Sequence, residues 1–348
     1  MMKHVVKSIL MVGLLLVVMA QIAAASERKV VIMTHDSFNA SKEVIQKFEQ
    51  QFDCRVDILR SGDAGEALNK AILTKSRPLA DLFFGIDNTF LSRALSQDMF
   101  VPYVSKELEQ IPDHLKLDPE FRLSPVDFGD VCLNYDIQWF KEQNLSPPML
   151  LEDILKTEYK GLTVVQNPAT SSPGLAFLLT TVSKFGESGY LKFWNDLKRN
   201  DVAITNGWKE AYWGQFSAAS EGSRPIVVSY ATSPAAEVFF SKETLAQSPT
   251  AAVIGQGSAF RQIEFAGILK GCQHLELAKK FMDFLLSTDF QEDIPLQMFV
   301  FPANSKAKLP EVFVKHSRIT QKPASVPSDR ISSQREHWIN QWTELMLQ

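Results

Sequence analysis

Acidic and aromatic side chains follow several short apolar runs in this sequence, where predicted strands end. The acids are Asp36, Asp63 and Asp87, and the aromatic residues are Trp208 and Tyr230. A carboxylate attracts a cation, and an aromatic face adds a cation–π contact of about 0.5 to 2 kcal/mol. These residue types therefore indicate a site that binds a small organic cation.

Each of these aspartates also has an ordinary structural explanation. An Asp after a strand is most often a helix N-cap or a turn residue, and this explanation is the stronger one for Asp36 and Asp87. For Asp63 the two explanations are balanced, because Gly62 and Gly65 allow backbone and ligand to approach closely. Asp63 is therefore the best candidate for a ligand contact among the three acids.

Two explanations also apply to the aromatic candidates, namely ligand contact and core packing. Aromatic side chains bury well wherever they fall, so packing alone explains many of them. The glycine before Trp208 and its position in a loop favour a place in the cleft, whereas Phe299 is balanced between the two.

Sequence motifs of the common hydrolases and nucleotide-binding enzymes are missing. The patterns GxGxxG, Walker A, GxSxG, HExxH and SxxK with KTG do not occur. Among the six histidines, His35 is the one in a predicted strand-end loop. We therefore expect no catalytic residues and no cofactor, and a secreted hydrolase remains a remote alternative.

The elements that must position these residues alternate between strand and helix. Buried or β-branched runs end before each candidate loop, and residues at helical spacing follow most of them. Such alternation predicts an α/β fold of mainly parallel sheets flanked by helices, with the candidate loops at the carboxyl edges of the strands. The predicted strands lie at 30–33, 56–58, 82–84, 162–165, 202–204 and 226–228.

Two further segments flank the second group of predicted strands, those at 162–165, 202–204 and 226–228. Residues 125–136 and 260–269 read as long strands, and we expect them to be the two crossovers between lobes. The N-terminal lobe would then contain 26–125 and 266–310, and the C-terminal lobe 126–265 and 311–348. Ligand would bind in the cleft between the lobes.

Ser171 and Ser172 stand at a predicted helix start. The segment 170–174 ends in Pro-Gly, and proline suits the first turn of a helix. Two hydroxyls and free N–H groups at this point either cap the helix or bind an anion.

The first 25 residues read as a cleavable signal peptide. Lys3 and Lys7 precede an apolar run at 9–20, which is shorter than the roughly 20 residues of a membrane span, and three alanines follow at 23–25. The chain carries a net charge of −4, which makes nucleic acid an unsuitable partner.

The three cysteines have no zinc-type spacing, so we expect them to be buried apolar residues, with one disulfide as the alternative.

Several of these segments together resemble the periplasmic thiamine-binding proteins of ABC importers, within the two-lobed type II solute-binding proteins. The likeness covers nearly all of the chain after the signal peptide, and its specificity lies in the order and spacing of the motifs. The shared segments are Thr-x-Asp-Ser-Phe at 34–38, Gly-Ile-Asp-Asn at 85–88, Pro-x-Asp-Phe-Gly at 125–129, Thr-Ser-x-Pro-Gly-Leu at 170–175, Gly-Trp-x-Glu-Ala-Tyr at 207–212, Ser-Tyr-x-Thr-Ser-Pro at 229–234 and Arg-x-x-Trp-Ile-x-x-Trp at 335–342.

The resemblance implies a fold, a function and a set of roles. The protein would be a monomeric periplasmic receptor that captures thiamine or its phosphates and delivers them to an ABC permease. Asp63 would face the thiazolium, Trp208 and Tyr230 would wall the cavity, and Ser171 would lie by the hydroxyethyl or phosphate end.

Three departures from the family pattern bear on the ligand. Family members have Tyr where His35 stands, Tyr where Ala236 stands and Trp where Phe299 stands, so we expect a thinner aromatic enclosure. Another small organic cation, such as a pyrimidine precursor or a polyamine, is the alternative ligand. Ferric iron is less well supported, because Tyr230 is followed by Ala231 and not by the second tyrosine of ferric-binding relatives.

Overall fold

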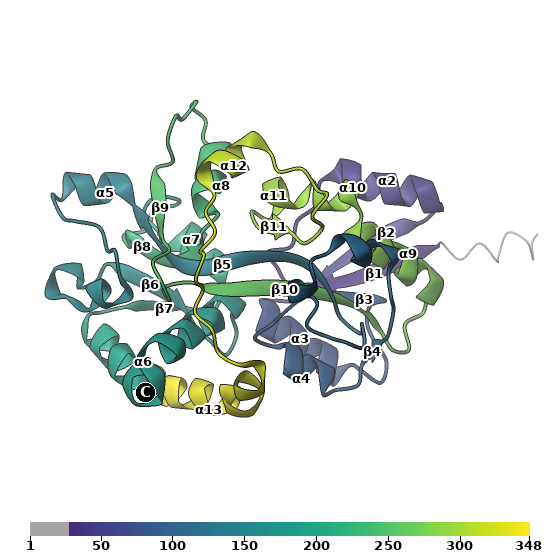
Figure 1. The fold of residues 1–348 in the computed structure, drawn as a ribbon, viewed down its shortest axis with the longest axis horizontal. Helices are drawn as coiled ribbons and strands as arrows, with labels where there is room; N and C mark the ends of the chain where they lie inside the picture. The colour runs from purple at the N-terminus through teal and green to yellow at the C-terminus, as the bar shows by residue number, and fades with distance from the viewer. Residues whose placement is uncertain (1–27) are drawn as a thin grey trace, which may run out of the picture.

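The computed structural model describes residues 28–348, so the predicted signal peptide at 1–25 lies outside the described part of the chain. One hydrogen-bonded sheet runs through the molecule in the order β2-β1-β3-β10-β5-β8-β6-β7, with three short strands paired at its sides. Figure 1 shows that helices cover this sheet and that the molecule has two lobes, with β5 and β10 passing between them. The predicted α/β class with two lobes is confirmed.

The N-terminal lobe is built on three parallel strands that alternate with helices. β1 pairs in parallel with both β2 and β3, as the predicted strand–helix alternation requires. Side chains of β1 such as Val30 and Ile32 are buried in the core. The elements are β1 (Lys29–Thr34), α2 (Lys42–Phe52), β2 (Arg55–Arg60), α3 (Ala64–Leu73), β3 (Leu82–Asp87) and α4 (Leu91–Leu95).

The C-terminal lobe repeats this plan. β6 pairs in parallel with β7 and β8, so their carboxyl ends share one edge. α6 begins close to the end of β6, because Gly174 has no side chain: a Cβ there would lie 2.6 Å from the Gln166 carbonyl oxygen. The elements are β6 (Thr163–Gln166), α6 (Ser172–Arg199), β7 (Ala203–Thr205), α7 (Trp208–Gly214), β8 (Ile226–Tyr230) and α8 (Ser233–Phe240).

The two long strands connect the lobes within the sheet. β5 (Ser124–Asp136) and β10 (Phe260–Leu269) pair antiparallel with each other, while β10 also pairs with β3 and β5 also pairs with β8. The two parallel sheets are thus joined into one by a central antiparallel pair. The register of β10 shifts between Glu264 and Phe265 toward β5, and between Phe265 and Ala266 toward β3.

Short strands and the remaining helices complete the two lobes. The segment 291–303 contains the end of a helix, a further short helix and a short strand. These elements are β4 (Phe100–Val101), α5 (Ile137–Glu142), β9 (Thr250–Val253), α9 (Leu275–Leu286), α10 (Thr288–Gln291), α11 (Ile294–Gln297), β11 (Phe301–Pro302), α12 (Glu311–His316) and α13 (Ser328–Leu347).

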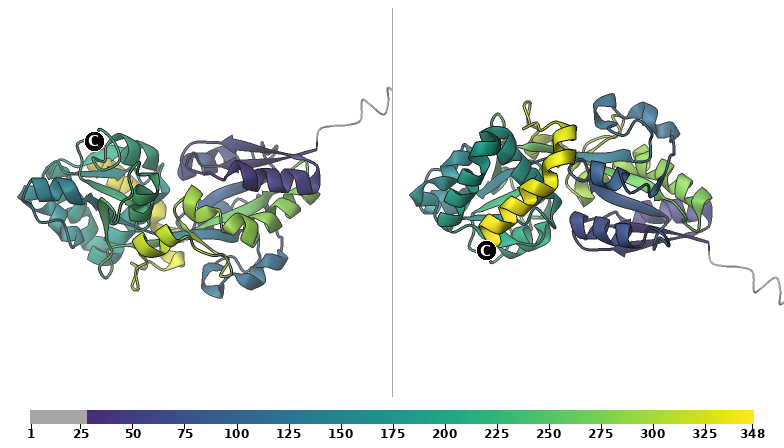
Figure 2. Two further views of the ribbon diagram at one scale, coloured as in Figure 1. Left: turned by 90° about the horizontal axis from the view of Figure 1, so that it is seen from above. Right: turned by 90° about the horizontal axis from the view of Figure 1, so that it is seen from below.

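Aromatic contacts hold the helices onto the sheet. Phe48 of α2 packs against Phe281 and Phe284 of α9, with ring centroids 4.9 and 5.2 Å apart. On the other lobe, Trp194 of α6 meets Trp342 of α13 edge to face at 5.5 Å, and both views of Figure 2 show α13 lying along that lobe. Aromatic pairs of this kind stabilise by about 0.5–1.5 kcal/mol beyond the area they bury.

Two further observations concern the class of protein. Within residues 28–348, no helix combines the length and apolar character needed to cross a bilayer. All three cysteines have free thiols: Cys132 is buried, and Cys54 and Cys272 are half-buried. The alternative of a disulfide is therefore not borne out.

Candidate functional site

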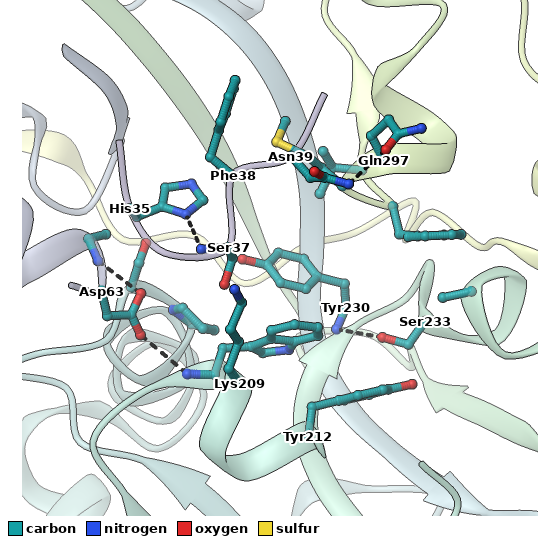
Figure 3. A pocket seen from close by; sticks show the side chains of 18 of the residues that line it. His35, Ser37, Phe38, Asn39, Asp63, Lys209, Tyr212, Tyr230, Ser233 and Gln297 are labelled. Carbon is teal, nitrogen blue, oxygen red and sulfur yellow. Dashed lines mark hydrogen bonds between the residues drawn. The ribbon is translucent and has the colours of Figure 1, made fainter. Parts of the chain in front are cut away.

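A cavity of about 280 Å³ lies between the lobes at the carboxyl ends of the strands. Ligand pockets in proteins begin near about 300 Å³, so this cavity suits one small molecule. Figure 3 shows side chains from both lobes converging on it. Six of the predicted site residues line it, namely His35, Asp63, Ser172, Trp208, Tyr230 and Phe299.

Asp63 is both a helix cap and a wall of the cavity. It is the N-cap of α3, and its Oδ1 accepts a hydrogen bond from the backbone N–H of Ala64 at 2.8 Å. Its Oδ2 accepts one from the backbone N–H of Trp208 at 3.2 Å, across the cleft. The structural and the ligand-binding explanations of Asp63 are therefore compatible.

Burial sets the charge properties of this carboxyl group. Burial raises the pKa of Asp63 above its ordinary value, and the hydrogen bond from Ala64, the His35 side chain and the Ser171 hydroxyl only partly offset this. A cation placed beside Asp63 would favour the ionised form. The site is thus able to hold a positive charge away from bulk water.

The lobes touch at the edge of the cavity next to Asp63. The backbone N–H of Gly65 donates to the Thr170 carbonyl at 3.2 Å, and a Cβ at position 65 would lie 2.9 Å from that oxygen. Lys209 Nζ donates to the Asp36 carbonyl at 2.5 Å. Gly65 therefore allows the close backbone approach that the sequence predicts, and the backbone that approaches it is that of the opposite lobe.

The two predicted aromatic walls are held in fixed orientations. Trp208 stacks on Tyr212 with centroids 4.9 Å apart and planes 19° apart, and its Nε1 donates to Ser229 Oγ at 2.9 Å. The Tyr230 hydroxyl donates to Gln262 Oε1 at 2.6 Å. Tyr212 covers one face of the indole, so a ligand can stack on the opposite face only.

Further aromatic residues narrow the mouth of the cavity. Phe240, at the end of α8, lines it and lies 5.1 Å from the ring of Phe299. Phe299 has a backbone φ of 55°, which is costly for a bulky residue, and its carbonyl accepts a hydrogen bond from the Thr232 hydroxyl. Trp213 and Tyr212 also line the cavity. The departures from the family pattern at positions 35, 236 and 299 predicted a thinner aromatic enclosure. That prediction did not include the rings of Phe240, Tyr212 and Trp213.

The hydroxyls of Ser171 and Ser172 do not cap the helix, which was one of the two roles predicted for them. α6 begins at Ser172 with Ser171 as N-cap, but no serine side chain caps the helix. Ser172 Oγ instead accepts a hydrogen bond from the Gln262 amide and lines the cavity. Ser171 is buried behind it and does not line the cavity.

Asp36 and Asp87 do not line the cavity, so Asp63 is the one of the three strand-end aspartates that does. Asp36 is exposed and accepts from the backbone N–H of Gly62 at 3.1 Å, which joins the loop after β1 to the loop after β2. Asp87 is fully buried and accepts from the Thr89 backbone N–H at 2.7 Å and hydroxyl at 2.5 Å. Burial raises its pKa to about 6. Through the Gln262 amide it supports Tyr230 from behind.

Sequence reasoning missed two acids beneath the cavity. Glu264 lines the cavity from the middle of β10, and one of its oxygens lies 3.2 Å from His35 Nε2. Asp127 faces it from the paired position on β5 and is fully buried. In the sequence, Glu264 could have been recognised as a site residue because it is an acidic residue inside a predicted buried strand. Asp127 stood in a recognised motif without an assigned role.

These groups suit an organic cation better than a bound metal. Among residues 28–348, no three His, Cys, Asp or Glu side chains are grouped so that they could hold a metal ion. The cavity instead combines a carboxylate, stacked aromatic rings and two cationic side chains near the rim, Arg60 and Lys209. Such a set can enclose a ring with a positive charge and one anionic end.

Comparison with known proteins gives a consistent result. A family model described as bacterial extracellular solute-binding protein matches residues 77–330. The chain is 30% identical over 326 residues to the thiamine-binding periplasmic protein of Brucella melitensis, covering 92% of each. It is 29% identical over 316 residues to the protein of the same name from Salmonella typhimurium, covering 89% of this chain and 91% of that one. A solved periplasmic thiamin binding protein matches with a TM-score of 0.80 and 25% identity, over 92% of this chain and 96% of that chain.

Proposed function

Because this chain belongs to the bacterial extracellular solute-binding proteins, a family of receptors and not of enzymes, we propose that it captures thiamine or a thiamine phosphate and delivers it to an ABC permease. The observation that carries the proposal is the position of Asp63 beside Trp208 and Tyr230 in one cavity between the lobes. A thiazolium is a flat cation, so it needs both a carboxylate and ring faces.

Each part of thiamine has a matching wall in this proposal. The thiazolium lies by Asp63, and the free face of Trp208 and the ring of Tyr230 cover the ligand rings. A phosphate would lie at the N-terminus of α6, where backbone N–H groups favour an anion and which lines the same cavity as Arg60 and Lys209. Ser171 stands behind Ser172 at that end and acts through Asp63.

The size of thiamine is compatible with tight binding. With about 18 non-hydrogen atoms, a nanomolar complex near −12 kcal/mol requires about −0.7 kcal/mol per atom, which is within the ceiling for compact ligands. That efficiency requires contact on most of the ligand surface. The rings of Phe240 and Phe299 at the mouth supply part of that contact.

The remaining features of the proposal concern compartment and domain limits. A signal peptide at 1–25 would export a monomeric receptor to the periplasm, the compartment named in its relatives. The lobes would consist of 26–125 with 266–310, and of 126–265 with 311–348. This division is supported by the passage of β5 and β10 between the lobes.

The test is direct measurement of the ligand. A native mass spectrum of the protein purified from the periplasm should contain the mass of thiamine or a thiamine phosphate. Isothermal titration calorimetry with thiamine, thiamine monophosphate, an aminopyrimidine and a polyamine then ranks the ligands, and product analysis should recover thiamine unchanged. Absence of thiamine binding would refute the proposal, and tighter binding of the polyamine or the aminopyrimidine would favour the second ligand class.

A further inference from the structure

Glu264 is an acidic residue in an apolar strand, and binding of a ring cation by Asp63 does not explain it. Its strand neighbours Ile263 and Phe265 are buried, and its own side chain is 11% exposed, toward the cavity. Burying a carboxylate is costly unless hydrogen-bond donors surround it. Two side chains, His35 and Asp127, adjoin Glu264.

The first neighbour is His35. Its Nδ1 accepts a hydrogen bond from the backbone N–H of Ser37 at 3.1 Å, which places the imidazole proton on Nε2. Nε2 lies 3.2 Å from Glu264 Oε1. Burial lowers the pKa of His35, but Glu264, Asp63 and Asp36 more than offset this effect, so the pKa lies above the ordinary value. In either protonation state His35 presents an N–H to Glu264.

The second neighbour is Asp127, which stands opposite Glu264 in the β5–β10 pair. It is fully buried, and no backbone or side-chain donor within residues 28–348 makes a hydrogen bond to its carboxyl oxygens. Burial, and then the nearby charge of Glu264, raise the pKa of Asp127 well above its ordinary value. This shift favours the protonated form of Asp127 beside Glu264.

His35 and Asp127 thus adjoin Glu264. A glutamate carboxylate offers acceptor sites only. The wall of the cavity at this point can accept hydrogen bonds from a ligand but cannot donate any. Asp63 supplies the charge recognised elsewhere in the cavity, so the contribution of Glu264 is directional.

We propose that Glu264 is a specificity-determining residue, which accepts a hydrogen bond from an amino group on the ligand ring and rejects a ring that carries a carbonyl in that place. The inference rests on the proposed function, because the ring it concerns is the aminopyrimidine of thiamine. A carbonyl facing Glu264 would place two acceptors together and leave a buried carboxylate without its donor.

The experiment compares thiamine with oxythiamine, in which a carbonyl replaces the ring amino group. Calorimetry on the wild-type protein should show a preference for thiamine of about 30-fold or more, as sites built to bind a donor reject analogues that lack it. In Glu264→Gln, whose amide both donates and accepts, that preference should fall by about tenfold or more. Asp63→Asn is the matched control: it should weaken both ligands and leave their ratio unchanged.

The outcomes separate the two proposals. A wild-type protein that binds neither compound overturns the proposed function together with this inference. A wild-type protein that binds thiamine while Glu264→Gln keeps the full preference overturns the role of Glu264 alone, as does a wild-type preference near one. If thermal unfolding shows that Glu264→Gln does not fold, Glu264→Asp replaces it. That variant keeps the charge but withdraws the carboxylate, and an unchanged preference there would equally refute the role.

Discussion

Replacing Asp63 with asparagine would test how this protein holds a cation. The change keeps the shape of the side chain and removes its charge. Asp63 accepts from the backbone N–H groups of Ala64 and Trp208 through two different oxygens. Asparagine has one acceptor oxygen, so its amide N–H₂ must face one of those donors. We therefore expect the variant to lose one hydrogen bond as well as the charge.

The two losses differ in size, and this difference makes the test informative. Removing one partner of a buried charge pair costs about 2 to 5 kcal/mol, or roughly 30- to 4,000-fold in affinity. A neutral hydrogen bond contributes about 1 kcal/mol, roughly fivefold. A decrease in thiamine affinity well above tenfold in Asp63→Asn therefore requires loss of the charge interaction.

The assay is calorimetry with thiamine and with 3-deazathiamine, in which a carbon replaces the charged thiazolium nitrogen. The variant should bind thiamine at least about 30-fold more weakly and should bind the neutral analogue almost as the wild type does. Asp98→Asn is the control at an exposed acid paired with Lys270, and it should change neither affinity. Thiamine affinity within twofold of wild type in Asp63→Asn would refute the reasoning.

The same group predicts a pH dependence. Because burial raises the pKa of Asp63 and a bound cation would lower it again, thiamine binding should release a proton over the range between those two values. Affinity should decrease as pH falls through the pKa of the unbound protein. Asp63→Asn should abolish that component, and an identical pH profile in the variant would exclude Asp63 as its source.

Four further substitutions test other parts of the structure. Trp208→Ala and Tyr230→Ala should each weaken thiamine binding by about 1–3 kcal/mol, measured by calorimetry, through lost buried area and cation–π attraction; unchanged affinity in both would remove them from the site. Gly65→Ala should push the lobes apart, because its Cβ would lie 2.9 Å from the Thr170 carbonyl, so binding should weaken with little change in melting temperature. Asp127 holds a proton that the unfolded chain releases above its ordinary pKa of 3.8, so the free energy of unfolding should decline as pH rises above that value. Asp127→Asn should flatten this decline in urea unfolding measured from pH 4 to 7, and an equal slope would show that Asp127 is ionised in the fold.

The strands and the helices were largely predictable because their signals are local. Each parallel strand is a short apolar run with polar residues at its ends, and each following helix shows apolar residues at helical spacing. The single sheet through both lobes was not predictable, because it depends on the register between β5 and β10, which are far apart in the sequence.

The site was predictable only where a residue type and a strand end coincide. That rule placed Asp63, Trp208 and Tyr230 in the cavity, and it ranked Asp63 above Asp36 and Asp87, which accept hydrogen bonds from the backbone N–H groups of Gly62 and Thr89 and do not line the cavity. The rest of the site depends on contacts between residues far apart in the sequence, so it could not be predicted. Asp127 and Glu264 meet through strand register, and Phe240 reaches Phe299 through the packing of α8.

The register shifts in β10 have a consequence for the lifetime of a bound ligand. A bulged strand bends more readily than an evenly paired one, and these shifts lie at Glu264, Phe265 and Ala266, where β10 passes between the lobes. We expect opening of the cleft to concentrate its bending there, on the microsecond to millisecond scale of hinge motions. The segment that carries Glu264 would then also set the dissociation rate, so a substitution that stiffens it should lengthen residence time even where it leaves every ligand contact in place.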